Sequence, residues 1–162
     1  MKARISTQSR RTTPSSARPV LRPVGVIRSV LKKRKNAPRQ GSEGAPDAWL
    51  EVRPWASDAL LGVAAGDELI VITWLHRGRR DVYQVRPRSD PRRRIAGVFA
   101  TRSPDRPNPL ELHPVTVREI AGNRLRIGPI EAIDGTPVVD LKPSLVCWFE
   151  KTRRRGRAPG GS

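Results

Sequence analysis

The sequence predicts an all-β protein made of short strands, arranged as a barrel or a compact sandwich. Its apolar runs are short, rich in valine and isoleucine, and separated by glycine, proline and aspartate. Several runs alternate apolar with polar residues, which is the period of a strand with one buried face. The 16 prolines in 162 residues also disfavour long helices.

About eight short strands are expected, at 23–30, 49–54, 67–75, 81–86, 94–100, 112–120, 123–130 and 136–141. Ala121-Gly122-Asn123 and Asp134-Gly135 are turn signals, because glycine and asparagine tolerate a positive φ. One short helix is expected near Ser57 to Leu61, with Ser57 as its N-cap and Gly62 as its stop.

The charge of the chain lies in its flanks. The formal net charge is +17, but residues 43–150 carry equal numbers of basic and acidic side chains. Residues 1–42 and 151–162 carry basic side chains and no acidic ones. We therefore expect a disordered basic tail at 1–20, a folded domain at 21–150 and a second disordered basic tail at 151–162.

Composition excludes several classes of protein. No run approaches the ~18 apolar residues of a transmembrane helix, and no apolar stretch follows the basic N-terminus as in a secretory signal. The single cysteine, Cys147, excludes an internal disulfide and a multi-cysteine metal site. No metal is expected, since His76 and His113 are the only imidazoles. We expect a cytoplasmic protein.

Residues 97–109 form an unusual loop directly after an apolar strand. No phosphate-binding loop, dinucleotide fingerprint or nucleophile elbow occurs in the chain. In this loop, however, Pro104, Pro107 and Pro109 fix the backbone and remove donors. Such rigidity suits a loop that holds functional side chains such as Arg102 and Arg106, although a stiff surface connector would share the composition.

This loop reads G-V-F-A-T-R-S-P-D-R-P-N-P and resembles the signature of the TrmO family, also called YaeB-like or VirR-like. The family consists of S-adenosylmethionine-dependent tRNA methyltransferases. Four further blocks agree with the family in order: V-G-V-I-R-S at 24–29, P-R-Q at 38–40, a strand ending at His76, and D-G-T-P-V-V-D-L-K-P at 134–143. The resemblance spans residues 24–143 and leaves both tails outside.

The resemblance implies a small β-barrel that forms a homodimer, with S-adenosylmethionine bound near the interface. It also implies N6-methylation of threonylcarbamoyladenosine next to the anticodon of threonine tRNA. The cofactor site carried over by position consists of Gln40, Gly41, Ser42, Leu75, His76, Arg102, Leu112, Glu131, Ala132, Ile133 and Asp134. Arg102 suits the cofactor's carboxylate, Glu131 or Asp134 its ribose, and Leu75 and Leu112 its adenine. A dedicated catalytic base is not required.

The chain departs from the family pattern at three places. Glu111 stands where the family usually has glycine, which adds a carboxylate beside the expected cofactor site. Ser144 stands where the family often has tyrosine. The longer bacterial members carry a second domain after the barrel, so we expect a short single-domain member whose acceptor is less secure than its cofactor.

Basic residues indicate where RNA would bind. Lys32, Lys33, Arg34 and Lys35, together with Arg106, are the expected nucleic-acid contacts, and deletion of 1–20 and 152–162 should weaken tRNA binding. Arginine runs that only maintain solubility are the plain alternative. Two other functions stay open, namely a methyltransferase with another RNA or a small molecule as acceptor, and a non-catalytic barrel that binds RNA or the cofactor.

Some residues also have an ordinary structural interpretation. His76 could be a surface or hydrogen-bonded histidine, and Arg102 could pair with Asp105 or Asp134. Cys147 is expected to be buried and inert. The four tryptophans are expected in the core or at a dimer interface: Trp49, Trp55, Trp74 and Trp148.

Overall fold

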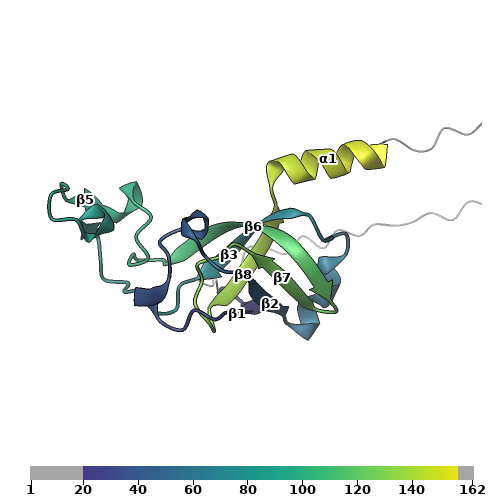
Figure 1. Cartoon of the computed structure of the whole chain (residues 1–162), viewed down its shortest axis with the longest axis horizontal. Helices are drawn as coiled ribbons and strands as arrows, with labels where there is room; N and C mark the ends of the chain where they lie inside the picture. The colour runs from purple at the N-terminus through teal and green to yellow at the C-terminus, as the bar shows by residue number, and fades with distance from the viewer. Residues whose placement is uncertain (1–19, 157–162) are drawn as a thin grey trace, which may run out of the picture.

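The structure is a computed structural model that describes residues 20–156. Six strands close into an antiparallel barrel in the order β1-β2-β7-β6-β3-β8, with β8 pairing back to β1 (Figure 1). Their bounds are β1 Gly25–Arg28, β2 Ala48–Val52, β3 Glu68–Trp74, β6 Leu110–Ala121, β7 Arg124–Gly128 and β8 Pro137–Pro143. The predicted small all-β barrel is confirmed.

Alternation along the strands fills the barrel. In β3 the buried positions are Leu69, Val71 and Thr73, and in β6 they are His113, Val115 and Val117. Every second side chain of a barrel strand faces the interior, so a two-residue period places these groups inside. Two polar side chains, Thr73 and His113, thereby enter the mainly aliphatic interior next to each other.

Two further strands form an arm outside the barrel. β4 (Gln84–Val85) pairs with β5 (Ala96–Gly97) in a separate two-stranded sheet. Figure 1 shows this arm extending from the end of the barrel where β3 finishes. The segments 81–86 and 94–100 are therefore strands only over two residues each, and the arginine-rich connection between them, residues 86–95, lies outside the barrel.

The helical prediction was right in place and wrong in detail. Residues Pro54–Leu60 form a 3₁₀ helix, η3, and Ser57 lies inside it rather than at its N-cap. Pro54 occupies the first turn, where its fixed φ and missing N–H cost nothing, so the helix begins earlier. Gly62 follows the end of η3 with φ of 90°, as the predicted stop requires.

The helix α1 (Leu145–Gly156) was not predicted, and it runs across the expected boundary between domain and tail at 150/151. Oγ of Ser144 accepts a hydrogen bond from the backbone N–H of Cys147 at 3.2 Å, which is the geometry of a capping serine. Asp67 at the start of β3 accepts a hydrogen bond from Lys151 of α1. The predicted tails at 1–19 and 157–162 lie outside the described residues.

The aromatic residues lie near the surface. None of the four tryptophans belongs to the core, so that part of the expectation was wrong, while an interface role stays a prediction. Three of them carry an arginine over the ring, namely Trp49, Trp55 and Trp74. Cys147 is buried at 8% exposure, as expected.

Candidate functional site

A cavity of about 960 Å³ opens at the end of the barrel where β3 finishes and β6 and β8 begin. Segments far apart in the sequence surround it: the 34–40 segment, the turn after β3, the arm, the 100–105 loop, and residues 131–136. The strand register explains why these segments lie together, because Trp74 at the end of β3 pairs with Leu110 of β6, and Thr73 pairs with Val138 of β8. The ends of three strands thus bring the family-like blocks together.

Most of the expected cofactor residues line this cavity. They are Gln40, Leu75, His76, Arg102, Glu131, Ala132 and Ile133. Gly41 adjoins it, since a Cβ there would lie 3.3 Å from Oε2 of Glu131 and 2.8 Å from the carbonyl oxygen of Pro129. Ser42, Leu112 and Asp134 are not among the lining residues.

Arg102 is held at the cavity wall by an unexpected partner. Its Nη2 donates to Oε1 of Glu111 at 2.8 Å and to the backbone carbonyl of Leu112 at 3.1 Å. The Glu111 side chain is only 14% exposed, whereas that of Arg102 is 61% exposed. The hydrogen bond and charge of Glu111 raise the pKa of Arg102 above its usual value, so the guanidinium stays cationic.

Glu131 and His113 form the floor of the cavity. Nδ1 of His113 lies 3.0 Å from Oε1 of Glu131, and its Nε2 lies 2.9 Å from Oγ1 of Thr73. Burial raises the pKa of Glu131, but the adjoining imidazole and the charge of Arg102 outweigh burial and hold the pKa below its usual range. The floor therefore carries an ionised carboxylate whose charge interacts with the guanidinium of Arg102.

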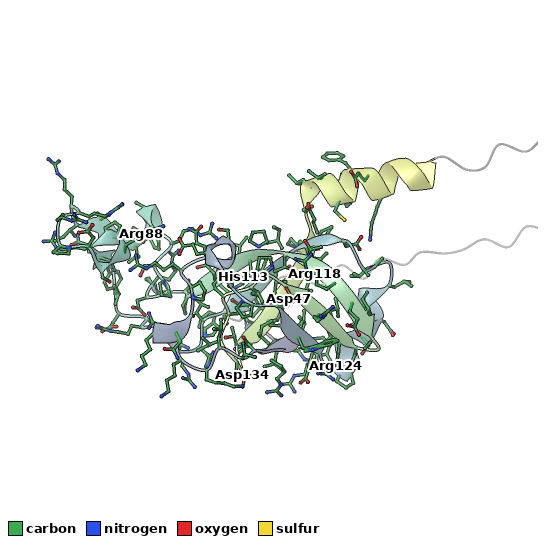
Figure 2. All side chains as sticks on the ribbon, viewed as in Figure 1. Asp47, Arg88, His113, Arg118, Arg124 and Asp134 are labelled. Atoms are coloured by element: carbon green, nitrogen blue, oxygen red, sulfur yellow. The ribbon has the colours of Figure 1, made fainter. Side chains whose placement is uncertain are left out.

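Asp134 is occupied elsewhere. Its Oδ1 accepts a hydrogen bond from the backbone N–H of Ser29 at 3.0 Å, and its Oδ2 lies 3.0 Å from Nζ of Lys32. Lys32 and the Ser29 N–H lower its pKa. In Figure 2, Asp134 lies at the lower edge of the barrel and His113 lies further inside. Asp134 thus ties the turn before β8 to the segment after β1.

The 98–109 loop is stabilised by Arg106. Its guanidinium donates to the backbone carbonyls of Val98, Thr101 and Ser103, and its own N–H donates to the carbonyl of Arg79. Arg106, an expected nucleic-acid contact, therefore makes its hydrogen bonds within the protein. The rigidity expected from the three prolines is reinforced by this side chain.

His76 lies on the cavity wall next to Arg77. Partial burial and the charge of Arg77 lower its pKa below the usual value of 6.5. The imidazole of His76 is consequently neutral at physiological pH.

The rim of the cavity is basic. Arg34 forms a two-point ion pair with Asp105, and Arg88 of the arm donates to Glu43. Lys32, Lys33 and Lys35 are exposed beside Arg34. The other guanidinium groups that line the cavity belong to Arg39, Arg77, Arg86 and Arg93. Basic side chains thus outnumber acidic ones among the residues that line the cavity.

Sequence reasoning missed His113, and it flagged Glu111 without finding its partner. The alternation of His113, Val115 and Val117 gave a usable signal, because it puts an imidazole on the inward face next to the motif loop. Within residues 20–156, no three histidine, cysteine or acidic groups gather as a metal site would require. That same part of the chain has no helix with the length and apolarity to cross a bilayer.

The sequence model of the TrmO N-terminal domain, described as the tRNA-methyltransferase O N-terminal domain, matches residues 26–147. The chain belongs to the TrmO family. A probable S-adenosyl-L-methionine-binding protein of Methanothermobacter thermautotrophicus is 42% identical over 123 residues, covering 76% of this chain and 88% of that relative. A second protein of that name, from Archaeoglobus fulgidus, is 40% identical over 147 residues, which are 85% of this chain.

The crystal structure of TrmO from Pseudomonas aeruginosa has a similar fold, with a TM-score of 0.63 and 26% identity. The likeness covers 91% of this chain and 61% of the TrmO chain. This chain likewise matches only 40% of the length of the Archaeoglobus relative. The TrmO barrel is thus shared, and the longer relatives contain further sequence beside it.

Proposed function

We propose that this chain is an S-adenosylmethionine-dependent methyltransferase that acts on tRNA. The observation that carries the proposal is the cavity in which the TrmO signature residue Arg102 faces the ionised floor carboxylate Glu131. The family description and the names of the relatives support the same reaction and cofactor.

The residues of the cavity fit this cofactor. S-adenosylmethionine presents a carboxylate, cationic groups, a ribose diol and an adenine ring. Arg102 suits the carboxylate, and Glu131 suits a cationic group or the diol. Leu75, Ala132 and Ile133 offer an apolar wall for adenine. Because Asp134 is engaged by Ser29 and Lys32, Glu131 is the better supported of the two carboxylates.

Gly41 supports the fit independently. A side chain there would collide with the carbonyl of Pro129 and crowd the Glu131 carboxylate. Glycine at this position keeps the approach to the floor carboxylate open. Gly41 therefore contributes to the site by having no side chain.

The protein's part in the reaction is to bind, orient and exclude water. When bound, the cofactor would supply a methyl group on a sulfonium. The acceptor nitrogen would bond to the methyl carbon as the carbon–sulfur bond breaks, the sulfur would leave as a neutral thioether, and the acceptor proton would pass to solvent. Arg102 and Glu131, anchored by Leu112 and His113, fix the two charged ends of the site. Fixed geometry of this kind lowers the barrier more than a dedicated base would.

The proposed acceptor is N6 of threonylcarbamoyladenosine, next to the anticodon. Lys32, Lys33 and Lys35 beside the opening, and the arginines of the rim, would hold the phosphate backbone. The basic flanks at 1–42 and 151–162 add sequence-independent attraction. Such a protein works where tRNA is processed, which supports the expected cytoplasmic location.

Isotope transfer tests this proposal. The purified chain is incubated with labelled S-adenosylmethionine and tRNA that carries threonylcarbamoyladenosine, and the nucleosides are identified by mass spectrometry. A methylated threonylcarbamoyladenosine that the Arg102→Ala variant does not make is the expected result. Label in another nucleoside would move the proposal to a different RNA acceptor, and cofactor binding without transfer would favour a non-catalytic binding barrel.

A different acceptor is the second candidate function, and one observation favours it. Glu111 occupies Arg102 at a position where the family usually has glycine. An added carboxylate at the cavity wall changes the shape and the charge that an acceptor meets there. A small molecule or another RNA could therefore be the acceptor that fits. The same incubation with a pool of small metabolites separates this candidate from the first.

We also propose a homodimer with the cavity near its interface. Several large apolar side chains near the opening are exposed: Phe99 by 85%, Tyr83 by 69% and Leu112 by 50%. Exposed apolar groups gathered in this way are typical of an interaction surface. Sedimentation of the chain and of a Phe99→Ser variant tests the dimer, which the substitution should weaken.

A further inference from the structure

Three polar side chains follow one another through short contacts, from the barrel interior to the cavity: Thr73 of β3, His113 of β6 and Glu131. Thr73 is 0% and His113 1% exposed, and Oγ1 of Thr73 lies 2.9 Å from Nε2 of His113. Nδ1 of His113 lies 3.0 Å from Oε1 of Glu131, outside ordinary hydrogen-bond geometry. Burying such groups is unfavourable unless they are paired, so the arrangement calls for an explanation.

The chemistry of the three groups indicates which nitrogen of His113 carries a hydrogen. An ionised carboxylate only accepts, so the contact with Glu131 is attractive only when Nδ1 carries a hydrogen. In that tautomer Nε2 accepts the hydroxyl hydrogen of Thr73, which lies 2.9 Å away. Thr73 thus provides a partner for Nε2 when Nδ1 presents its N–H to Glu131.

The order hydroxyl, imidazole, carboxylate is also that of a hydrolase triad. Thr73, however, is fully buried and does not line the cavity, whereas His113 and Glu131 do. No substrate can reach the hydroxyl. Thr73 therefore has no catalytic role of its own. It contacts His113, and His113 in turn contacts Glu131 at the cavity.

We propose that His113 is a positioning residue that orients Glu131 and keeps its negative charge directed at the cationic part of the cofactor. This inference rests on the proposed function for its ligand, but not for the contact between His113 and Glu131. The pKa of Glu131 lies below its usual range despite burial, which agrees with such a partner. The other charged groups that face this floor are Arg102 and Glu111.

Nδ1 of His113 lacks a hydrogen-bond partner of good geometry, and this indicates how the positioning would work. A small rotation of the Glu131 carboxylate, whose Oε1 already lies 3.0 Å from Nδ1, would complete this hydrogen bond. A cation drawn into the cavity favours the ionised form of Glu131, which in turn is the form that accepts from Nδ1. Ligand binding and the hydrogen bond to His113 therefore strengthen each other.

Two variants of His113 separate positioning from simple packing. His113→Leu fills the space but has no N–H, whereas His113→Asn retains an N–H close to the place of Nδ1. The ionisation of Glu131 is followed in the full chain by carbon-13 NMR of the labelled carboxyl group, without any cofactor. We expect the titration midpoint of Glu131 to rise in His113→Leu and to stay near the wild-type value in His113→Asn.

Calorimetric titration with S-adenosylmethionine provides the second measurement. His113→Leu should weaken binding by about tenfold or more, as loss of an outer partner of a ligand does, and His113→Asn should restore most of the affinity. Glu131→Gln should weaken binding as well, and the double variant should lose little beyond either single one.

An unmoved Glu131 midpoint in a folded His113→Leu protein would overturn the inference, as would additive losses in the double variant. If His113→Leu does not fold, Thr73→Val, a buried substitution of similar shape, tests the same contacts through the tautomer of His113 in nitrogen-15 spectra. A wild-type chain that binds no cofactor would contradict the proposed function, while the midpoint would still decide whether His113 positions Glu131.

Discussion

At the scale of the residue, the hydrogens of Arg102 limit what it can bind. A guanidinium grips a carboxylate with two parallel N–H groups, either Nε with Nη2 or Nη1 with Nη2. Both modes use Nη2, and Nη2 already donates to Glu111 and to the carbonyl of Leu112. Glu111 thus competes with an incoming carboxylate for Nη2, and such a ligand is left with the N–H groups of Nε or Nη1.

Replacing Glu111 should therefore help the cofactor to bind. Glu111→Gln keeps the shape and removes the competing charge, so calorimetry should give an affinity for S-adenosylmethionine about three- to tenfold higher. Glu119→Gln is the matched control, because Glu119 pairs with Arg126, which does not line the cavity. Weaker binding in Glu111→Gln would mean that Glu111 supports the ligand rather than competing with it.

At the scale of the element, the 98–109 loop shows how sequence signals were divided between folding and function. The prolines correctly predicted a rigid loop, and Arg102 lines the cavity. Arg106 was expected to meet RNA, yet its guanidinium spans the carbonyls of Val98, Thr101 and Ser103. The sequence shows that a side chain is cationic but not which acceptors the folded loop brings to it.

Arg106→Gln should consequently act on stability. Loss of these hydrogen bonds should cost about 1–3 kcal/mol and lower the melting temperature by roughly 3–10 °C, as calorimetric melting would show. Cofactor affinity should fall because the loop also carries Arg102, and the salt dependence of RNA binding should stay the same. Arg94→Gln, at an exposed arginine between the two strands of the arm, should leave the melting temperature unchanged. If the Arg106→Gln protein is as stable as the wild type and its RNA affinity depends less steeply on salt, Arg106 contacts a phosphate as first expected.

An ion pair between Lys151 and Asp67 holds the helix α1 against the barrel. Burial raises the pKa of Asp67, but the hydrogen bonds from Lys151 and the Ala64 N–H outweigh burial and lower it. A group with a lowered pKa contributes stability above its unfolded pKa of about 3.9. That contribution is lost as the pH falls through the folded pKa.

Asp67→Asn should therefore destabilise the protein at pH 7 by about 1–3 kcal/mol in urea unfolding, and the difference should shrink below about pH 4. Asp81→Asn is the control, because Asp81 and Arg79 form an ion pair with both side chains largely exposed. A difference that stays constant across this pH range would show that charge plays no part in docking α1.

Strand periodicity predicted most of the fold because each barrel strand has one buried face. All eight predicted segments contain a strand, and Gly122 makes the predicted turn with φ of 63°. α1 was missed because its basic second half resembled a tail, although Ser144 before Leu145-Val146 was a start signal. Asp134 was expected in the cavity, but contacts with Ser29 and Lys32 come from a segment 100 residues away and have no local signal.

At the scale of the whole molecule, the excess positive charge lies in the two flanks and not in the folded segment between them. Residues 43–150 are neutral overall, so the barrel folds without strong self-repulsion, and the flanks carry the excess of +17. The lining of the cavity is also mainly basic, with Glu111 and Glu131 as carboxylates that interact with Arg102. Under the proposed function, the basic flanks would attract tRNA and the cavity would bind the cofactor.

Removing rim cations should flatten the salt dependence of RNA binding. A triple Lys32→Ser, Lys33→Ser, Lys35→Ser variant should lower the slope of log affinity against log salt by about two units, since each phosphate contact contributes about 0.7–0.9. The control removes three cations of the barrel strands β6 and β7, none of which lines the cavity: Arg118→Ser, Arg124→Ser, Arg126→Ser. Equal losses in both variants would mean that RNA responds to total charge and not to the rim.

The most direct test of the account is a calorimetric titration of the purified chain with S-adenosylmethionine, repeated with Arg102→Ala. The cavity predicts binding in the micromolar range for the wild-type chain and a loss of at least tenfold in the variant, which has no guanidinium for the ligand carboxylate. Equal affinity in the two proteins would contradict the account, because the ligand would then bind elsewhere.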